Sequence, residues 1–140
     1  MNSSDQHLNY LLLEIAKTRN KLNFLSFDST HYDLYEDLLH DLENELMEIY
    51  GNYLHSTLSL IYHQYRIKDQ MMNPLAFIPW EFTITSGASE LNVETRPEHS
   101  LAVSTSQFPD ESIKLALLPS PVRFVVYLQK NRKGMVVWQA

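Results

Sequence analysis

Histidines and acids are the residues whose types and spacing come nearest to a reactive site. Asp37 and His40 are three positions apart, the spacing with which carboxylate-rich helix bundles present two metal ligands from one helix. On a helix, however, His40 points away from the apolar stripe, whereas the ligands of a bundle core must face inward. His55 and His63 would lie about 12 Å apart along a helix, too far to share one ion. The sequence therefore predicts no metal site and no cofactor.

His99 lies between Glu98 and Ser100, so a base, an acid and a hydroxyl follow one another in sequence. Adjacent side chains on a strand or turn point apart, and a catalytic set is assembled in space rather than along the chain. The chain has no cysteine, which excludes thiol nucleophiles, disulfides and thiolate zinc sites. We predict no catalytic residue, and the sequence favours a non-enzymatic protein over an enzyme.

A long helical segment, residues 29–68, is expected to organise the chain. Its apolar residues recur every three or four positions, which keeps them on one face of a helix. This first stripe comprises Tyr35, Leu39, Leu42, Leu46, Ile49 and Tyr53. Gly51 lies within the segment at a cost of about 1 kcal/mol relative to alanine. Because the stripe keeps its phase past Gly51 to Leu60, we expect one continuous or slightly kinked helix that ends before Pro74.

A shorter helix is expected before the long one, over residues 5–23, because apolar residues recur there at helical spacing. The connection between the two is about six residues long, which makes the helices antiparallel neighbours. Residues 1–68 are thus predicted to form a helical hairpin. Residues 69–79, which contain two prolines, are predicted to be a connector.

From Trp80 onward apolar residues alternate with polar ones, the pattern of half-buried strands. Strand candidates occur at residues 80–85, 91–95, 101–105, 113–118, 122–129 and 134–138. Segment 122–129 is apolar on both faces, so we place it centrally, paired with 134–138 across a turn at 131–134. We predict a single domain, residues 1–140, of the α+β class. In it, residues 80–140 form an antiparallel sheet of about five strands that packs on the long helix.

The second half of the long helix carries a second apolar stripe. It comprises Tyr50, Leu54, Leu58, Ile61 and Tyr65. The sheet can cover one stripe, but a helix of roughly 60 Å is longer than one small sheet can occupy. A second copy of the chain is the simplest cover for the other stripe. We therefore predict a homodimer with these five residues at its two-fold interface.

The net charge is −6, and no lysine or arginine occurs between Leu22 and Tyr65. This acidic helix argues against nucleic acid and against an anionic membrane surface as partners, whereas it suits a basic protein. No apolar stretch approaches the roughly 20 residues that cross a bilayer, and no secretion signal is recognisable at the start of the sequence. We expect the protein in the cytoplasm.

Two functions remain open at this point. The first is a non-enzymatic, homodimeric module for protein interaction or assembly. The second is a small-molecule-binding α+β domain, with or without catalysis, whose pocket lies between the sheet and the long helix. Its candidate pocket residues are Trp80, Glu81, Arg123, Tyr127 and Trp138. In the order of its elements the chain resembles the cone-shaped domains of the nuclear transport factor 2 type, which implies such a pocket; the resemblance is one of architecture and rests on no residue motif.

Overall fold

Two antiparallel helices begin the chain, and they confirm the predicted hairpin. The structure is a computed structural model that describes residues 3–26, 28, 30–87, 91–106, 113–128 and 134–140. Helix α1 spans Ser3–Phe24 and helix α2 spans Tyr32–Gln64. The apolar side of α1 is fully buried in the core, as its spacing predicts, through Leu8, Leu11, Leu12 and Ile15.

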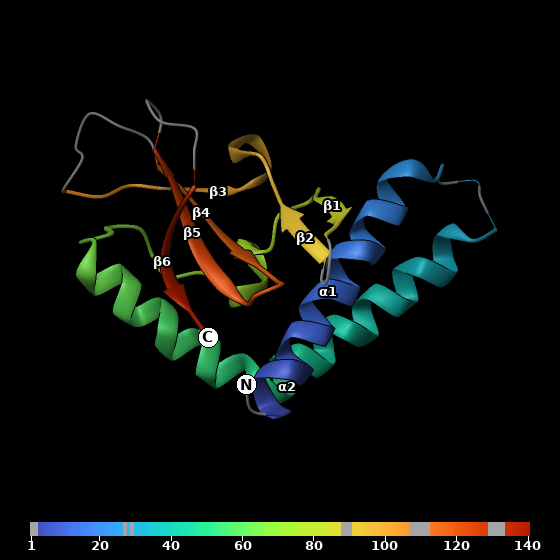
Figure 1. The fold of residues 1–140 in the computed structure, drawn as a ribbon, viewed down its shortest axis with the longest axis horizontal. Helices are drawn as coiled ribbons and strands as arrows, with labels where there is room; N and C mark the ends of the chain where they lie inside the picture. Colours follow the sequence, from blue (N-terminus) through green and yellow to red (C-terminus); the bar gives the residue numbers. More distant parts are fainter. Residues whose placement is uncertain (1–2, 27, 29, 88–90, 107–112, 129–133) are drawn as a thin grey trace.

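Helix α2 continues through Gly51, as expected, but it bends more strongly than a slight kink. Figure 1 shows that the bend lies near the middle of α2 and that the two arms of the helix form a V. Glycine is compatible with this bend because its backbone is less restricted in conformation than that of other residues. We call the part of α2 before Gly51 the first arm and the part after it the second arm. Helix α1 packs on the first arm.

Helix α2 ends at Gln64, before the predicted end at Lys68. Arg66 has a left-handed φ of 52°, a conformation that stops a right-handed helix. The chain turns there because the following residues approach the end of a strand: the backbone N–H of Lys68 donates a hydrogen bond to the carbonyl of Ser104 at 3.0 Å. The sequence-based end was wrong because a pairing partner distant in sequence competes with the helix.

Six strands follow in two antiparallel sheets, so the α+β class is confirmed and the predicted single sheet is divided. A two-stranded ribbon consists of β1, Thr83–Ser86, and β2, Leu91–Glu94. The larger sheet has the order β3-β4-β5-β6. Its strands are β3, Leu101–Val103; β4, Ile113–Leu118; β5, Arg123–Leu128; and β6, Met135–Gln139. Strand β5 lies between β4 and β6, as its two apolar faces predict.

Two details of the strand prediction need comment. The first strand begins at Thr83 rather than at Trp80, because α1 holds the preceding residues. The side-chain amide of Asn20 both donates to the carbonyl of Phe82 and accepts from its N–H, each at 2.9 Å, as a neighbouring strand would. The predicted turn at 131–134 lies outside the described residues except for Gly134.

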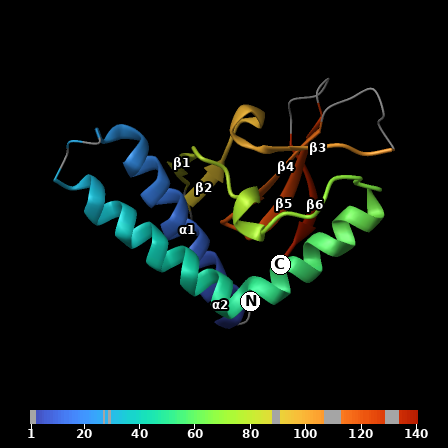
Figure 2. The ribbon, with the colours of Figure 1, turned by 180° about the vertical axis from the view of Figure 1, so that it is seen from behind.

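The larger sheet lies inside the V and places one face on the second arm of α2 (Figures 1 and 2). The register puts Leu115, Leu117, Phe124 and Val126 on one face, and all four are buried. A short 3-10 helix, η1, Pro74–Phe77, also contacts α2, where the ring of Phe77 meets the ring of Tyr62 edge to face at 6.3 Å. The core is therefore shared by both helices, the connector and the sheet.

Candidate functional site

The five residues predicted at a dimer interface lie mostly inside the chain. Leu54 and Leu58 are fully buried and Ile61 is 2 % exposed. Tyr50 is also buried, and its hydroxyl is hydrogen-bonded to Nδ1 of His7 at 2.8 Å, whereas Tyr65 is half-buried. The bend in α2 brings the sheet onto this stripe, so four of its five residues are covered within one chain and only Tyr65 keeps part of its surface. The homodimer and the place of its interface stay predictions.

Part of the exposed apolar surface belongs to the first stripe. From the bend onward, this stripe leaves α1 and the sheet covers the other one. Ile49, just before Gly51, is 53 % exposed, and Tyr53 and Leu60 on the second arm are 45 % and 69 % exposed. Strand β6 adds two further exposed apolar side chains, Met135 and Val136. We call these five residues the α2–β6 flank.

The parts of the flank are joined by an aromatic contact. The ring of Tyr53 on α2 meets the indole of Trp138 on β6 at 5.9 Å, and that indole also packs on Phe124 of β5 at 5.7 Å. In both ribbon views β6 descends toward the second arm of α2 (Figures 1 and 2). This contact joins the second arm of α2 to the outer strand. Along that strand Met135 pairs with Val126 and Val136 with Val125, so their side chains leave the sheet edge on opposite faces.

Four of the five flank residues lie in segments without a formal charge, and Ile49, which follows Glu48, is the exception. From Gly51 to Tyr65, and again from Gly134 to Ala140, the sequence has no Asp, Glu, Lys or Arg, although 20 % of the chain is charged. Charged residues are depleted at the centres of protein–protein interfaces. Apart from its Ile49 end, where Glu48 is exposed, this surface can therefore be covered without removing an ion from water.

Strand β6 is an edge of the larger sheet, so one row of its backbone groups is not paired within that sheet. Proteins commonly protect such edges with lysine, proline or an irregular backbone. Residues 134–140 contain neither a charge nor a proline. A shift in register between Phe124 and Val125 of the neighbouring strand, which leaves Val137 as an extra residue, is an irregularity of that kind. An extended, apolar strand could add to this edge.

The five predicted pocket residues are distributed over four places rather than one. The guanidinium of Arg19 lies over the ring of Trp80, with Cζ at 5.0 Å from the ring centroid. Glu81 pairs with His99, with 3.1 Å between Oε2 and Nε2. Trp138 belongs to the flank side of the sheet, and its indole packs on Phe124.

Arg123 and Tyr127 share the opposite face of β5. The Arg123 guanidinium is buried and donates hydrogen bonds to three backbone carbonyls, those of Pro119 at 2.7 Å, Pro121 at 3.0 Å and Val93 at 2.8 Å. It also reaches the carboxylate of Glu94 at 3.3 Å. These bonds clamp the β4–β5 turn to β2, so the guanidinium is occupied by the fold.

The space between the sheet and α2 is filled by apolar side chains. Leu54 and Leu58 of the helix, and Leu117 and Phe124 of the sheet, have no exposed surface. A cone-like pocket at this place, as the resemblance in element order implied, would need some of these side chains to leave the core. The expected pocket is therefore not formed there in this conformation.

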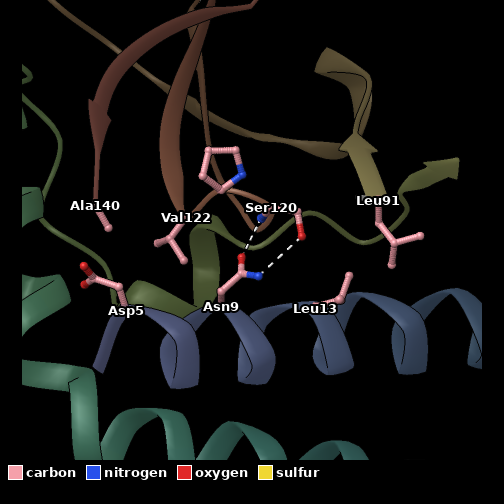
Figure 3. A pocket seen from close by; sticks show the side chains of 8 residues that line it. Asp5, Asn9, Leu13, Leu91, Ser120, Val122 and Ala140 are labelled. Atoms are coloured by element: carbon pink, nitrogen blue, oxygen red, sulfur yellow. Dashed lines mark hydrogen bonds between the residues drawn. The ribbon is translucent and has the colours of Figure 1, made fainter. Parts of the chain in front are cut away.

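A notch does occur elsewhere, between the start of α1 and the β4–β5 turn. Its volume is about 260 Å³, below the range of roughly 300–1,000 Å³ that is usual for ligand sites. Figure 3 shows Asn9 holding Ser120 across it: the amide oxygen of Asn9 accepts from the backbone N–H of Ser120 at 2.6 Å, and its nitrogen donates to the Ser120 hydroxyl at 3.5 Å. The other lining residues are Asp5, Leu13, Leu91, Pro121, Val122 and Ala140.

The histidines and acids singled out for chemistry remain apart. Asp37 and His40 are exposed on the first arm of α2, and His55 and His63 are exposed on the second. Among the described residues no group of three or more His, Asp or Glu is placed to hold a metal ion. None of the described helices combines the length and the apolar character that a membrane span requires.

Comparisons with known proteins add no identification. No family model, no curated protein and no solved structure matches this chain.

Proposed function

We propose that the protein is a non-enzymatic assembly module that forms a homodimer through the α2–β6 flank. The observation that carries the proposal is an exposed apolar surface, nearly free of charge, on the second arm of α2 and the open strand edge of β6. Burial of apolar area provides the main driving force for association, and dimer interfaces are the more apolar class of protein contact. The chain without cysteine needs no oxidising compartment, so we propose the cytoplasm as its location.

A second copy is the occupant that the flank suits best. Two antiparallel edges are complementary to each other, so one strand can pair with its own copy across a two-fold axis. The protein carries a net charge of −6, and two copies therefore repel one another over most approaches. At the flank, two copies can meet with few like charges facing each other, since Glu48 beside Ile49 is the one acid next to a flank residue in the sequence.

The experiment is a measurement of mass in solution by light scattering, with a matched pair of variants. Leu60 and Leu34 are both exposed leucines on α2, 69 % and 64 %, but only Leu60 belongs to the flank. We expect twice the chain mass of 16.4 kDa for the wild type and for Leu34→Glu, and a monomer for Leu60→Glu. A monomeric wild type at micromolar concentration would refute the proposal, as would equal masses for the two variants.

Small-molecule binding is the second candidate function. The notch in Figure 3 is the observation that favours it, and it lies between the start of α1 and the β4–β5 turn rather than between the sheet and α2. The notch combines apolar walls with the polar side chains of Asp5 and Asn9, as small ligand sites do. A fragment screen by NMR tests it: a ligand there would shift the backbone amide of Ser120. A screen in which the Ser120 amide never moves would reject this candidate.

A further inference from the structure

The indole of Trp80 is held outside the core in a fixed position. Its side chain is 69 % exposed, although the backbone around it is anchored by α1. Asn23 donates to the carbonyl of Trp80 at 2.8 Å, and Arg19 donates to the carbonyls of Ile78 at 2.5 Å and Pro79 at 3.1 Å. An exposed tryptophan on a fixed backbone is a typical anchor of a binding surface, because little freedom is lost when a partner covers it.

Trp80 borders a groove between the end of α1 and the first arm of α2. The groove has a volume of about 420 Å³, within the usual range for binding sites. Its lining combines two carboxylates, two large aromatic rings and apolar side chains, and comprises Arg19, Leu22, Asn23, Tyr32, Glu36, Leu39, His40, Glu43 and Trp80. We call it the Trp80 groove.

The chain itself shows which chemistry the groove accepts. The guanidinium of Arg19 lies over the Trp80 ring, with Cζ at 5.0 Å from the ring centroid, and its Nη2 is 3.2 Å from Oε1 of Glu43. An indole face and a carboxylate together bind a planar cation by cation–π attraction and charged hydrogen bonds. Glu36 lines the same groove, is exposed, and has no ion pair within the described part of the chain.

The surroundings of the groove are strongly negative. Between Tyr32 and Tyr50 the sequence has seven acids and no lysine or arginine. Such a field attracts a basic segment and raises its rate of association. The charge complementarity therefore favours a positively charged partner over an acidic or neutral one.

We infer that the Trp80 groove binds an arginine side chain from a basic segment of another protein. The planar guanidinium stacks on the exposed indole and pairs with the Glu36 carboxylate. A lysine ammonium fits less well, because it neither stacks nor forms paired hydrogen bonds. This inference names a site for the basic partner and does not depend on the dimer, because the groove is lined by one chain.

The test uses a fluorescein-labelled peptide of alternating arginine and glycine, with binding followed by fluorescence anisotropy. Trp80→Ala is expected to weaken binding about five- to tenfold, the loss of one cation–π contact. Glu36→Gln should weaken it by a similar factor. Glu48→Gln is the matched control: Glu48 is an exposed acid on the same arm, outside the groove lining, and its loss should change affinity less than about twofold.

Three results would overturn the inference. The wild type does not bind the arginine peptide, neither Trp80→Ala nor Glu36→Gln weakens binding, or Glu36→Gln and Glu48→Gln weaken it equally. Equal weakening would indicate attraction to the acidic helix as a whole. Equal affinity for the matching lysine peptide would also reject the preference for guanidinium. Leu60→Glu separates the two proposals, because the monomer is expected to keep its affinity for the peptide.

Discussion

Arg123→Met tests whether this guanidinium serves the fold or a ligand. Methionine keeps an unbranched apolar side chain but removes the cation and its donors. In the structure these donors meet the backbone carbonyls of Pro119, Pro121 and Val93. After the substitution, the carbonyls would remain near the β4–β5 turn and β2 without their partner.

The magnitude follows from those bonds. A hydrogen bond to a charged group contributes about 1.5–3 kcal/mol, but burial of the cation offsets part of the gain. The contact with Glu94 adds little, because that side chain is 64 % exposed. We therefore expect Arg123→Met to lower the free energy of unfolding by about 3–5 kcal/mol, the usual cost when one partner of a buried charged contact is removed.

Urea unfolding at fixed protein concentration, followed by tryptophan fluorescence, measures this loss. Arg96→Met is the control, because Arg96 is exposed and a surface substitution changes stability by only about 0.5 kcal/mol. A loss below about 1 kcal/mol for Arg123→Met, or equal losses for both variants, would refute the structural role. Arg123 would then be available to bind a ligand.

Two further predictions concern Tyr127 and Gly51. The Tyr127 hydroxyl is buried and has no hydrogen-bond partner among the described residues, so Tyr127→Phe should leave the free energy of unfolding unchanged or raise it by up to about 1 kcal/mol in urea. Burial, and then the nearby Glu94 carboxylate, raise the pKa of Tyr127. The stability that this shift contributes to the folded state is complete below the unfolded pKa of about 10 and is lost as the pH rises through the folded pKa. Urea unfolding should show a loss of stability above about pH 10 that is smaller in Tyr127→Phe, and equal losses would contradict this origin. Gly51→Ala gains up to about 1 kcal/mol of helix propensity, against a contact of 3.2 Å with the flexible Met47 Cε; the midpoint of thermal unfolding should rise, and a fall would show that the bend requires glycine.

The helices and the central strand were predictable because their signals are local. The spacing of apolar residues in α1 and α2 reports which faces are buried, and the continuous apolar run of β5 reports burial on two sides. The end of α2 could not be obtained in this way, because Lys68 pairs with Ser104. A local pattern of apolar residues does not report that this distant pairing competes with the continuation of the helix.

The sites were less predictable than the elements. The sequence indicated two apolar stripes on α2, but the bend near Gly51 decides which stripe the sheet covers. The amide contacts of Asn9 with Ser120 and of Asn20 with Phe82 join residues far apart in sequence, and neither has a motif. The alternation from Trp80 onward predicted a strand residue at this position, whereas Trp80 is 69 % exposed, and its groove depends on two helices.

Cysteine cross-linking along β6 tests most directly whether two copies meet at this edge. The chain has no cysteine, so a cysteine placed singly at each position from Met135 to Gln139 can bridge only to its copy. Paired antiparallel residues lie about 4.5–5.5 Å apart between Cα atoms, which a disulfide can span. We predict a covalent dimer under mild oxidation at one or two neighbouring positions, and none for Ala102→Cys on β3, the other edge of the sheet. No cross-link along β6, or equal cross-linking at Ala102, would contradict the proposed assembly.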